Sequence, residues 1–336
     1  MDSVRAERDG TGYYPYFDYL RAIAAAGVFV SHADVHHYFP ENLGNACVQI
    51  FFALSGFLIG GILLRSKPGD MPRFYFNRAT RIWIPYAIAI GLLALVTAVK
   101  QGFREPKFFE FFFYMVTFVY NWFGPPQLAE FQHRMPLDGA GNHFWSICVE
   151  EQFYLLAPLA IFLLPRIGLF VCLTLASILS PNYFLSVSLG VVLAIVGSRA
   201  TFILTSAAMG AIGAASGSYI VAVSFFSVAL VGLLAREGPR TVVGRIAGGA
   251  SYPFYLNHWT GLFVISPAMK HGIPYIVAMP FGFILAAALS VAHYLWIDRT
   301  IATHRGEWFS DRIGAILCIT AFVLVIVGLI GPFFVF

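Results

Sequence analysis

The amino-acid sequence predicts an all-α fold, a polytopic transmembrane bundle of about 10–11 membrane-spanning helices. Of the 336 residues, 59% are hydrophobic and only 11% are charged, and the mean hydropathy is +0.75. A soluble domain carries about 25% charged residues. Apolar stretches of the roughly 20 residues that a helix needs to cross the hydrocarbon layer recur from Phe17 to Phe336. This pattern excludes an ordinary soluble globular protein.

Each expected crossing is an apolar stretch between polar or basic flanks. The expected crossings cover residues 16–35, 45–64, 82–99, 108–123, 145–165, 200–216, 218–235, 247–266, 273–295 and 313–336. The stretch 167–198 is apolar as well, but Ser180-Pro181-Asn182 interrupts it. It can therefore form one kinked crossing or two short ones.

Basic loops orient the expected bundle, because arginine and lysine concentrate on the cytoplasmic side of membrane proteins. Such residues gather in three loops, within 65–81, 236–245 and 299–312. The first two loops share a side only if an even number of crossings separates them, which holds if 167–198 crosses once. The sequence then predicts eleven helices with the N-terminus inside. The basic residues between 100 and 107 fit this topology less well, because they would lie outside.

The ends of the chain add two short regions to the predicted membrane domain. Residues 1–15 are polar and mixed in charge, without the apolar core and small-residue cleavage site of a signal peptide. We therefore expect a cytoplasmic N-terminal tail at 1–15, a membrane domain at 16–312 and an additional C-terminal transmembrane helix at 313–336.

Cysteine usage and net charge exclude further classes of site and partner. The four cysteines stand singly in apolar segments without CxxC spacing, which argues against a disulfide framework and against a zinc site. The net charge of +4 comes mostly from the basic loops, so it does not imply a nucleic-acid partner.

The first crossing contains ionisable residues that a lipid-facing helix would not carry. Asp18, Arg21 and His32 lie in or near it, and a charged side chain at the bilayer centre costs about 2.5–3.5 kcal/mol on insertion scales. At about 100° per residue, Arg21 and His32 point to the same face. Asp18 lies one turn before Arg21, where opposite charges pair. Alternatively, Asp18 and Arg21 anchor the helix at the interface and His32 caps its outer end.

A second polar cluster opens the crossing at 145–165. It contains two adjacent carboxylates and an amide, and Ser146 and Glu150 share a face at four-residue spacing. The alternative is an interfacial helix start, with aromatic residues in the belt and acids near the helix N-terminus. The residues of interest in this cluster are Trp145, Ser146, Glu150, Gln152 and Tyr154.

Two further groups have both functional and structural interpretations. Arg78 and Arg81 lie one turn apart with Arg73 before them, and paired guanidinium groups suit phosphates, although the positive-inside rule demands the same residues. Asn257 and His258 lie within an apolar helix, where a histidine is a functional candidate or a hydrogen-bonded structural residue.

Taken together and in this order, these motifs resemble the acyltransferase-3 family of bacterial membrane acyltransferases. The resemblance covers roughly residues 16–300. The matching segments are Asp18-x-x-Arg21 with His32, Phe51 to Ile59 with Ser55 at its centre, Arg78-x-x-Arg81, Trp145 to Tyr154, and Ser251 to Trp259. The sequence departs from the family at its closing Glu-Arg-Pro, which is here Asp298-Arg299-Thr300.

The resemblance implies an O-acyltransferase of the bacterial cytoplasmic (inner) membrane, in contact with membrane lipid. The donor would be a cytosolic acyl-CoA, in the first instance acetyl-CoA, and no metal is expected. The acceptor would be a hydroxyl of a surface polysaccharide, a lipid-linked glycan or a glycosylated small molecule. The phosphates of the donor would lie near Arg78, Arg81 and Arg73.

The resemblance also implies roles for residues of the four clusters. His32 would act as general base on the acceptor hydroxyl, supported by Arg21, Glu150 and Asp18. By helix rise Arg21 is about 16 Å from His32, so we expect it to line the donor path or to pair with Asp18 or Glu150. The expected substrate pocket contains Ser55, Trp145, Ser146, Gln152, Tyr154, Asn257 and His258.

Other interpretations stay open at the level of sequence. A transporter could use Asp18, Arg21, His32 and Glu150 as a proton or substrate relay, although the chain shows no inverted repeat. A different acyl group, such as succinyl, could be transferred. Direct transfer and a transient acyl-histidine are not distinguished.

Overall fold

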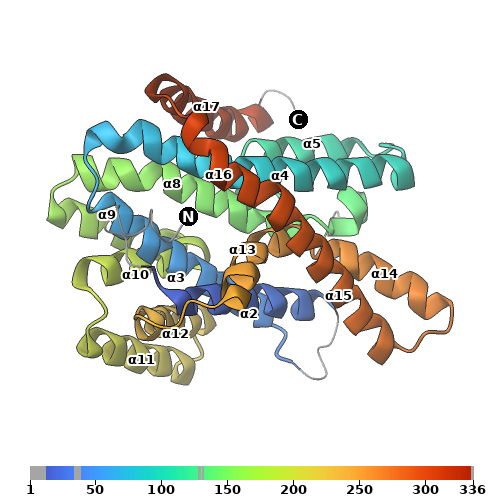
Figure 1. The fold of residues 1–336 in the computed structure, drawn as a ribbon, viewed down its shortest axis with the longest axis horizontal. Helices are drawn as coiled ribbons and strands as arrows, with labels where there is room; N and C mark the ends of the chain where they lie inside the picture. The colour runs from blue at the N-terminus through green and yellow to red at the C-terminus, as the bar shows by residue number, and fades with distance from the viewer. Residues whose placement is uncertain (1–12, 34–38, 128–129, 131, 334–336) are drawn as a thin grey trace. The chain divides into compact units, whose positions relative to one another are not determined.

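The computed structural model describes residues 13–33, 39–127, 130 and 132–333. The described residues form helices, short 3-10 turns and loops, and no strand occurs among them (Figure 1). This confirms the predicted all-α class. The tail predicted at 1–15 lies almost entirely outside the described residues.

The α-helices follow the predicted crossings along most of the chain. Their bounds are α2 Pro15–His32, α3 Leu43–Leu63, α4 Met71–Gln101, α5 Pro106–Val116, α6 Tyr120–Phe123, α8 Trp145–Leu163, α9 Arg166–Leu179, α10 Pro181–Val196, α11 Ala200–Ala215, α12 Tyr219–Leu234, α13 Val242–Asn257, α14 Trp259–Lys270, α15 Tyr275–His293, α16 Arg299–Trp308 and α17 Asp311–Ile330.

Among the residues that the structure describes, five helical runs are long and apolar enough to cross a membrane, and four shorter apolar helices accompany them. The long runs are Leu43–Leu63, Pro68–Gln101, Asn142–Leu163, Tyr275–Trp308 and Asp311–Phe333, and the short helices are α9 to α12. A helix rises about 1.5 Å per residue, so α4, with 31 residues, is about 46 Å long and exceeds a hydrocarbon layer of about 30 Å by roughly 16 Å.

The crossing predicted at 108–123 is wrong as a continuous helix. Helix α5 has 11 residues and ends at Val116, and the one-turn helix α6 begins only at Tyr120. Phe118 between them has φ 56°, the left-handed region, which a continuing helix does not allow. An 11-residue helix is about 16 Å long and does not span the hydrocarbon layer.

The ambiguous stretch 167–198 forms two helices that fold back on each other. Helix α9 ends at Leu179, α10 begins at Pro181, and the two helices pack together. The hydroxyl of Ser188 donates to the carbonyl of Leu173 at 3.3 Å across the turn. A single kinked crossing, the choice that the loop charges favoured, is therefore wrong. The number of crossings and the side of each loop stay predictions.

The chain divides into two compact units. Unit 1 contains the described residues of Met1–Ser66 and Ala160–Tyr294, and unit 2 contains Lys67–Leu159 with the described residues of Leu295–Phe336.

Helix α2 lies at the centre of unit 1. The side chains of Phe17 and Leu20 pack into one buried apolar cluster with α3, α10 and α12. Ala25 and Phe29, further along the helix, pack into a second cluster with α13, α14 and α15. Around this centre α11 lies beside α12 and α14 beside α15 (Figure 1). Polar side chains on α2 are therefore placed inside the unit.

Small residues allow the backbones of unit 1 to approach closely, as is common in membrane bundles. A Cβ added at Gly56 in α3 would lie 2.1 Å from the carbonyl oxygen of Val187 in α10. A Cβ added at Gly248 in α13 would lie 2.5 Å from the Cβ of Asp18 in α2. Only glycine fits at these two crossings.

Unit 2 is built around the long helix α4. Helices α16 and α17 pack on α4, and α5 contacts α6 and α17. Helix α8 is tied to α4 by side chains: Tyr75 donates to the carbonyl of Leu155 at 3.4 Å, and the indole of Trp83 donates to Glu151 at 2.9 Å. This pairing places the polar start of α8 beside the arginine-bearing start of α4.

Candidate active site

His32, the last residue of α2, is hydrogen-bonded to His258 at the end of α13. The two ring nitrogens, His32 Nδ1 and His258 Nε2, are 2.8 Å apart, and the ring planes differ by 12°. His32 is an exposed residue, whereas His258 has only 1% of its surface exposed. Unit 1 thus brings together two histidines that lie 226 positions apart in the sequence.

The backbone around His258 determines which of its nitrogens carries a proton. Its Nδ1 lies 2.8 Å from the carbonyl oxygen of Tyr255, which can only accept, so a neutral His258 donates from Nδ1. Its Nε2 is then an acceptor, and His32 Nδ1 must donate to it. The neutral His32 therefore has its lone pair on Nε2, the nitrogen that can accept a proton.

Local helix chemistry positions His258. The side chains of Asn257 and His258 donate to carbonyl groups of the last turn of α13, those of Pro253 at 3.1 Å and Tyr255 at 2.8 Å. Near the end of a helix the last carbonyl groups have no backbone N–H partner within the helix, and side-chain donors such as these can bind there. The predicted crossing 247–266 is consequently divided into α13 and α14 at His258.

The predicted pairing of Asp18 with Arg21 is confirmed. Arg21 Nη1 lies 3.6 Å from Asp18 Oδ1, and Tyr13 donates to the other carboxylate oxygen. Both charged side chains are largely covered, with 22% and 13% of their side-chain surfaces exposed. Since Arg21 and His32 lie on one continuous helix, about 16 Å of helix rise separates them. Arg21 is therefore too far along α2 to contact His32.

The three arginines predicted to bind phosphate lie in the first turns of α4, in unit 2. Arg73 and Arg81 are exposed, and the guanidinium of Arg73 lies 4.7 Å from the ring centre of Phe309. Arg78 is half-buried, 5.7 Å from the ring centre of Tyr154. All three residues lie within about 15 Å of helix rise from the start of α4.

Glu150 and Tyr154 of α8 lie beside Arg78. Tyr154 donates to Glu150 Oε1, and Arg78 interacts electrostatically with both residues. Unit 2 thus contains a cluster of a guanidinium, a carboxylate and a phenol, which the sequence analysis did not predict. His32 and His258 belong to unit 1.

Comparison with known proteins identifies this half of the chain. Residues 14–180 match the family model of the acyltransferase-3 family, described as an acyltransferase domain. These residues belong to the acyltransferase-3 family. The matched segment includes Asp18, Arg21, His32, Arg78 and Glu150, and ends before Asn257 and His258.

Curated relatives cover the same part of the acyltransferase domain. The O-acetyltransferase OatA of Staphylococcus aureus strain NCTC 8325 / PS 47 is 31% identical over 162 residues, which are 46% of this chain and 26% of that protein. The peptidoglycan O-acetyltransferase OatA of Listeria monocytogenes is 30% identical over 166 residues, 46% of this chain and 25% of that protein. The matched part is about a quarter of these relatives' length. No solved structure matches the chain.

Two predicted pocket residues of the acyltransferase domain have structural partners. Gln152 is buried and donates to the carbonyl of Phe118 at 2.7 Å and to Asn121 at 2.8 Å, while its oxygen accepts from Asn121 and Trp122 at 3.3 and 3.2 Å. Ser146, also buried, donates to the carbonyl of His143 at 3.2 Å. Their role in a substrate pocket stays a prediction, and the contacts of Gln152 hold the turn that ends α5.

The remaining predicted pocket residues lie apart in the chain. Ser55 is half-buried in α3 of unit 1, and Trp145 is half-buried at the start of α8 in unit 2. Asn257 is buried, and its Oδ1 has no hydrogen-bond partner. The structure therefore joins His258 to His32 and leaves the substrate contacts of the other residues as predictions.

Sequence reasoning missed Glu151 and Trp83 as site residues. Glu151 is only 4% exposed, accepts from Trp83 with one oxygen, and has no partner for the other. Its position next to Glu150 in an apolar helix was the available signal. Nothing in the sequence distinguished Trp83 from an ordinary interfacial residue, because a tryptophan near a helix start is typical of the membrane interface.

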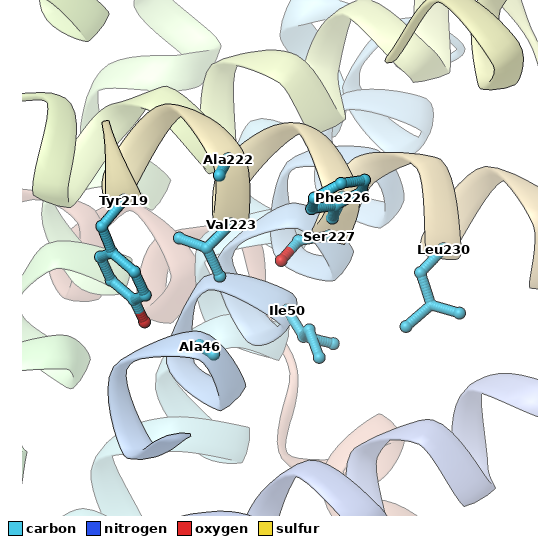
Figure 2. Close-up of a pocket in the computed structure, with 8 residues that line it drawn as sticks. All are labelled: Ala46, Ile50, Tyr219, Ala222, Val223, Phe226, Ser227 and Leu230. Carbon is cyan, nitrogen blue, oxygen red and sulfur yellow. The ribbon is translucent and has the colours of Figure 1, made fainter. Parts of the chain in front are cut away.

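An apolar pocket of about 290 Å³ lies between α3 and α12 of unit 1 (Figure 2). Its polar atoms come from Tyr219, which donates to the carbonyl of Asn42 at 2.8 Å, and from Ser227. The lining residues are Ala46, Ile50, Tyr219, Ala222, Val223, Phe226, Ser227 and Leu230. No predicted site residue lines this pocket, so it is separate from the candidate site.

Proposed function

We propose that this chain is a membrane O-acyltransferase that moves an acyl group, acetyl in the first instance, from cytosolic acyl-CoA to a hydroxyl of a carbohydrate-containing acceptor. The observation that carries the proposal is the hydrogen-bonded series from His32 through His258 to the carbonyl of Tyr255. It leaves the accessible histidine with a basic Nε2. The acyltransferase-3 match and the relatives named as O-acetyltransferases agree with this chemistry.

The reaction follows from this arrangement as general base catalysis. His32 Nε2 removes the proton of the acceptor hydroxyl while the oxygen attacks the thioester carbonyl. The tetrahedral intermediate collapses, the C–S bond breaks, and the CoA thiolate takes the proton from the His32 imidazolium. Because His32 lies in the last turn of α2, where unpaired carbonyl groups favour a cation, the helix end stabilises that imidazolium. The bond to His258 holds its orientation.

The donor is proposed to bind through unit 2. Arg73, Arg78 and Arg81 at the start of α4 present guanidinium groups that suit the phosphates of CoA, and α4 is long enough to carry them beyond the hydrocarbon layer. Positive-inside orientation would place this end in the cytoplasm, where acyl-CoA is found.

The acceptor is proposed to be a bacterial glycan. One relative is named a peptidoglycan O-acetyltransferase. A surface polysaccharide, a lipid-linked glycan and a glycosylated small molecule present the same hydroxyl chemistry. The proposed location is the bacterial cytoplasmic membrane.

The test is thiol release from acetyl-CoA by the detergent-purified chain, with and without a crude glycan acceptor. His32→Ala is the decisive variant, and His271→Ala, an exposed histidine at the end of α14, is the matched control. Acceptor-dependent release that falls about a hundredfold or more in His32→Ala alone supports the proposal. Equal release by both variants removes His32 from the chemistry. No release with any donor would favour a transporter that uses the same residues as a relay.

A further inference from the structure

Among the buried side-chain atoms of unit 2 for which no hydrogen bond is found, two are complementary. One is Glu151 Oε2, an acceptor, on a residue that is 4% exposed; the other is Arg78 Nε, a donor. The two side chains interact electrostatically across α8 and α4. Neither atom is used in the acyl-transfer steps described above.

Glu151 is held rigidly, so its unpartnered oxygen has a defined position. Its other oxygen accepts from the Trp83 indole at 2.9 Å, and the ring of Trp83 stacks on Phe118 with centres 5.9 Å apart. Phe118 is fixed in turn, because its carbonyl accepts from Gln152 at 2.7 Å. The hydrogen bonds of Gln152 therefore support the position of its neighbour in the sequence.

An unpaired buried carboxylate oxygen opposes folding, because desolvation is not compensated. A buried polar group without a partner in the protein calls for a specific explanation, such as a functional role or a bound molecule. A ligand group that served both atoms would donate to a carboxylate oxygen and accept from a guanidinium N–H. A secondary amide does both, with its N–H and its C=O.

The order of polar groups along α4 matches the order of chemical groups in a ligand that contains such an amide. Arg73 lies near the helix start, Arg78 follows, and Trp83 lies about 15 Å of helix rise beyond Arg73, further into the membrane domain. Coenzyme A presents its groups in the same order, with phosphates first and then the two secondary amides of the pantetheine arm.

We propose that Glu151, held by Trp83, accepts a hydrogen bond from a pantetheine amide N–H of acyl-CoA, and that Arg78 Nε donates to the carbonyl of that amide. The inference rests on the proposed function for the identity of the donor. It assigns to Glu151 the recognition of the pantetheine arm and leaves proton transfer to His32.

The test is equilibrium binding of two probes to the detergent-purified full chain, by calorimetry. The first probe is CoA, and the second is adenosine 3′,5′-bisphosphate, which has phosphates but no amide. Glu151→Gln keeps an oxygen for Trp83 and presents an NH₂ group to the ligand N–H. We expect it to weaken CoA binding about tenfold to a hundredfold and to leave the bisphosphate unchanged.

Glu110→Gln is the matched control, since Glu110 is a buried carboxylate of the same unit with both oxygens occupied. Lys107 lies 2.6 Å from one oxygen, and Tyr114 donates to the other at 3.0 Å. We expect Glu110→Gln to lower the melting temperature and to leave CoA binding intact. Glu151→Gln keeps an oxygen that accepts from Trp83, and its melting temperature is measured so that a loss of CoA binding can be distinguished from a loss of folding.

Three results would overturn the inference: unchanged CoA binding in Glu151→Gln, an equal loss for both probes, or no CoA binding by the wild type. Thiol release is measured separately, so the two proposals fail differently. CoA binding that depends on Glu151 without any acyl transfer would overturn the proposed function alone. Transfer that is indifferent to Glu151 would overturn the inference alone.

Discussion

Replacing His258 by alanine tests whether the second histidine orients the first. The substitution removes the acceptor that lies 2.8 Å from His32 Nδ1. His32 then loses the contact that keeps its proton on Nδ1, and the imidazolium formed during transfer loses a charged hydrogen bond. Such bonds contribute about 1.5–3 kcal/mol, which corresponds to roughly a tenfold to a hundredfold fall in kcat. The loss should be smaller than that in His32→Ala, which removes the base itself.

The assay is acceptor-dependent thiol release from acetyl-CoA across a range of pH, with His258→Gln as the rescue variant. Glutamine offers an oxygen that can accept from His32 Nδ1, so His258→Gln should recover much of kcat while KM for acetyl-CoA stays constant. A structural role would instead lower the amount of folded protein and leave the pH profile of the folded fraction unchanged. Wild-type rates in His258→Ala, or equal losses in both variants, would refute the reasoning.

Two further predictions concern stability and are measured by thermal melting in detergent. Gly56→Ala would place a Cβ 2.1 Å from the carbonyl oxygen of Val187, so α3 and α10 must separate and the melting temperature should fall, whereas Gly91→Ala in α4, with nothing within 4 Å, should keep or raise it. Gln152→Ala leaves the carbonyl of Phe118 and the side chain of Asn121 without their partner, at about 1–3 kcal/mol for each buried group. A melting temperature that falls equally in both glycine variants, or stays constant in Gln152→Ala, would contradict these assignments.

The predicted crossings agree with the observed helices where the hydrophobicity of the local sequence is sufficient to identify a helix. Helices α11, α12, α15 and α17 lie within a few residues of the predicted ranges. The crossing predicted at 108–123 failed because apolar composition does not distinguish a side chain that faces lipid from one that faces protein. The aromatic run at 108–123 is apolar, yet Gln152 ends its helix by binding the backbone of Phe118.

The candidate site likewise contains one contact that the sequence predicted and another that it could not predict. Spacing along α2 predicted that Asp18 pairs with Arg21, and the structure confirms it at 3.6 Å. The sequence suggested His32 and His258 as candidates but did not predict their contact, because a contact over 226 positions depends on which helix faces meet. Glu151 was overlooked since only its surroundings distinguish it from Glu150.

From the sequence alone it follows that this chain is an all-α membrane protein, which residues within each helix share a face, and which motifs resemble an acyltransferase. These properties depend on composition and on a period of about 3.6 residues, and both are local. Only the tertiary structure decided that the carbonyl of Tyr255 sets the proton positions of two histidines and that one oxygen of Glu151 is left without a partner. Hydrogen-bond partners are fixed by packing between distant segments, and packing is a property of the folded chain as a whole.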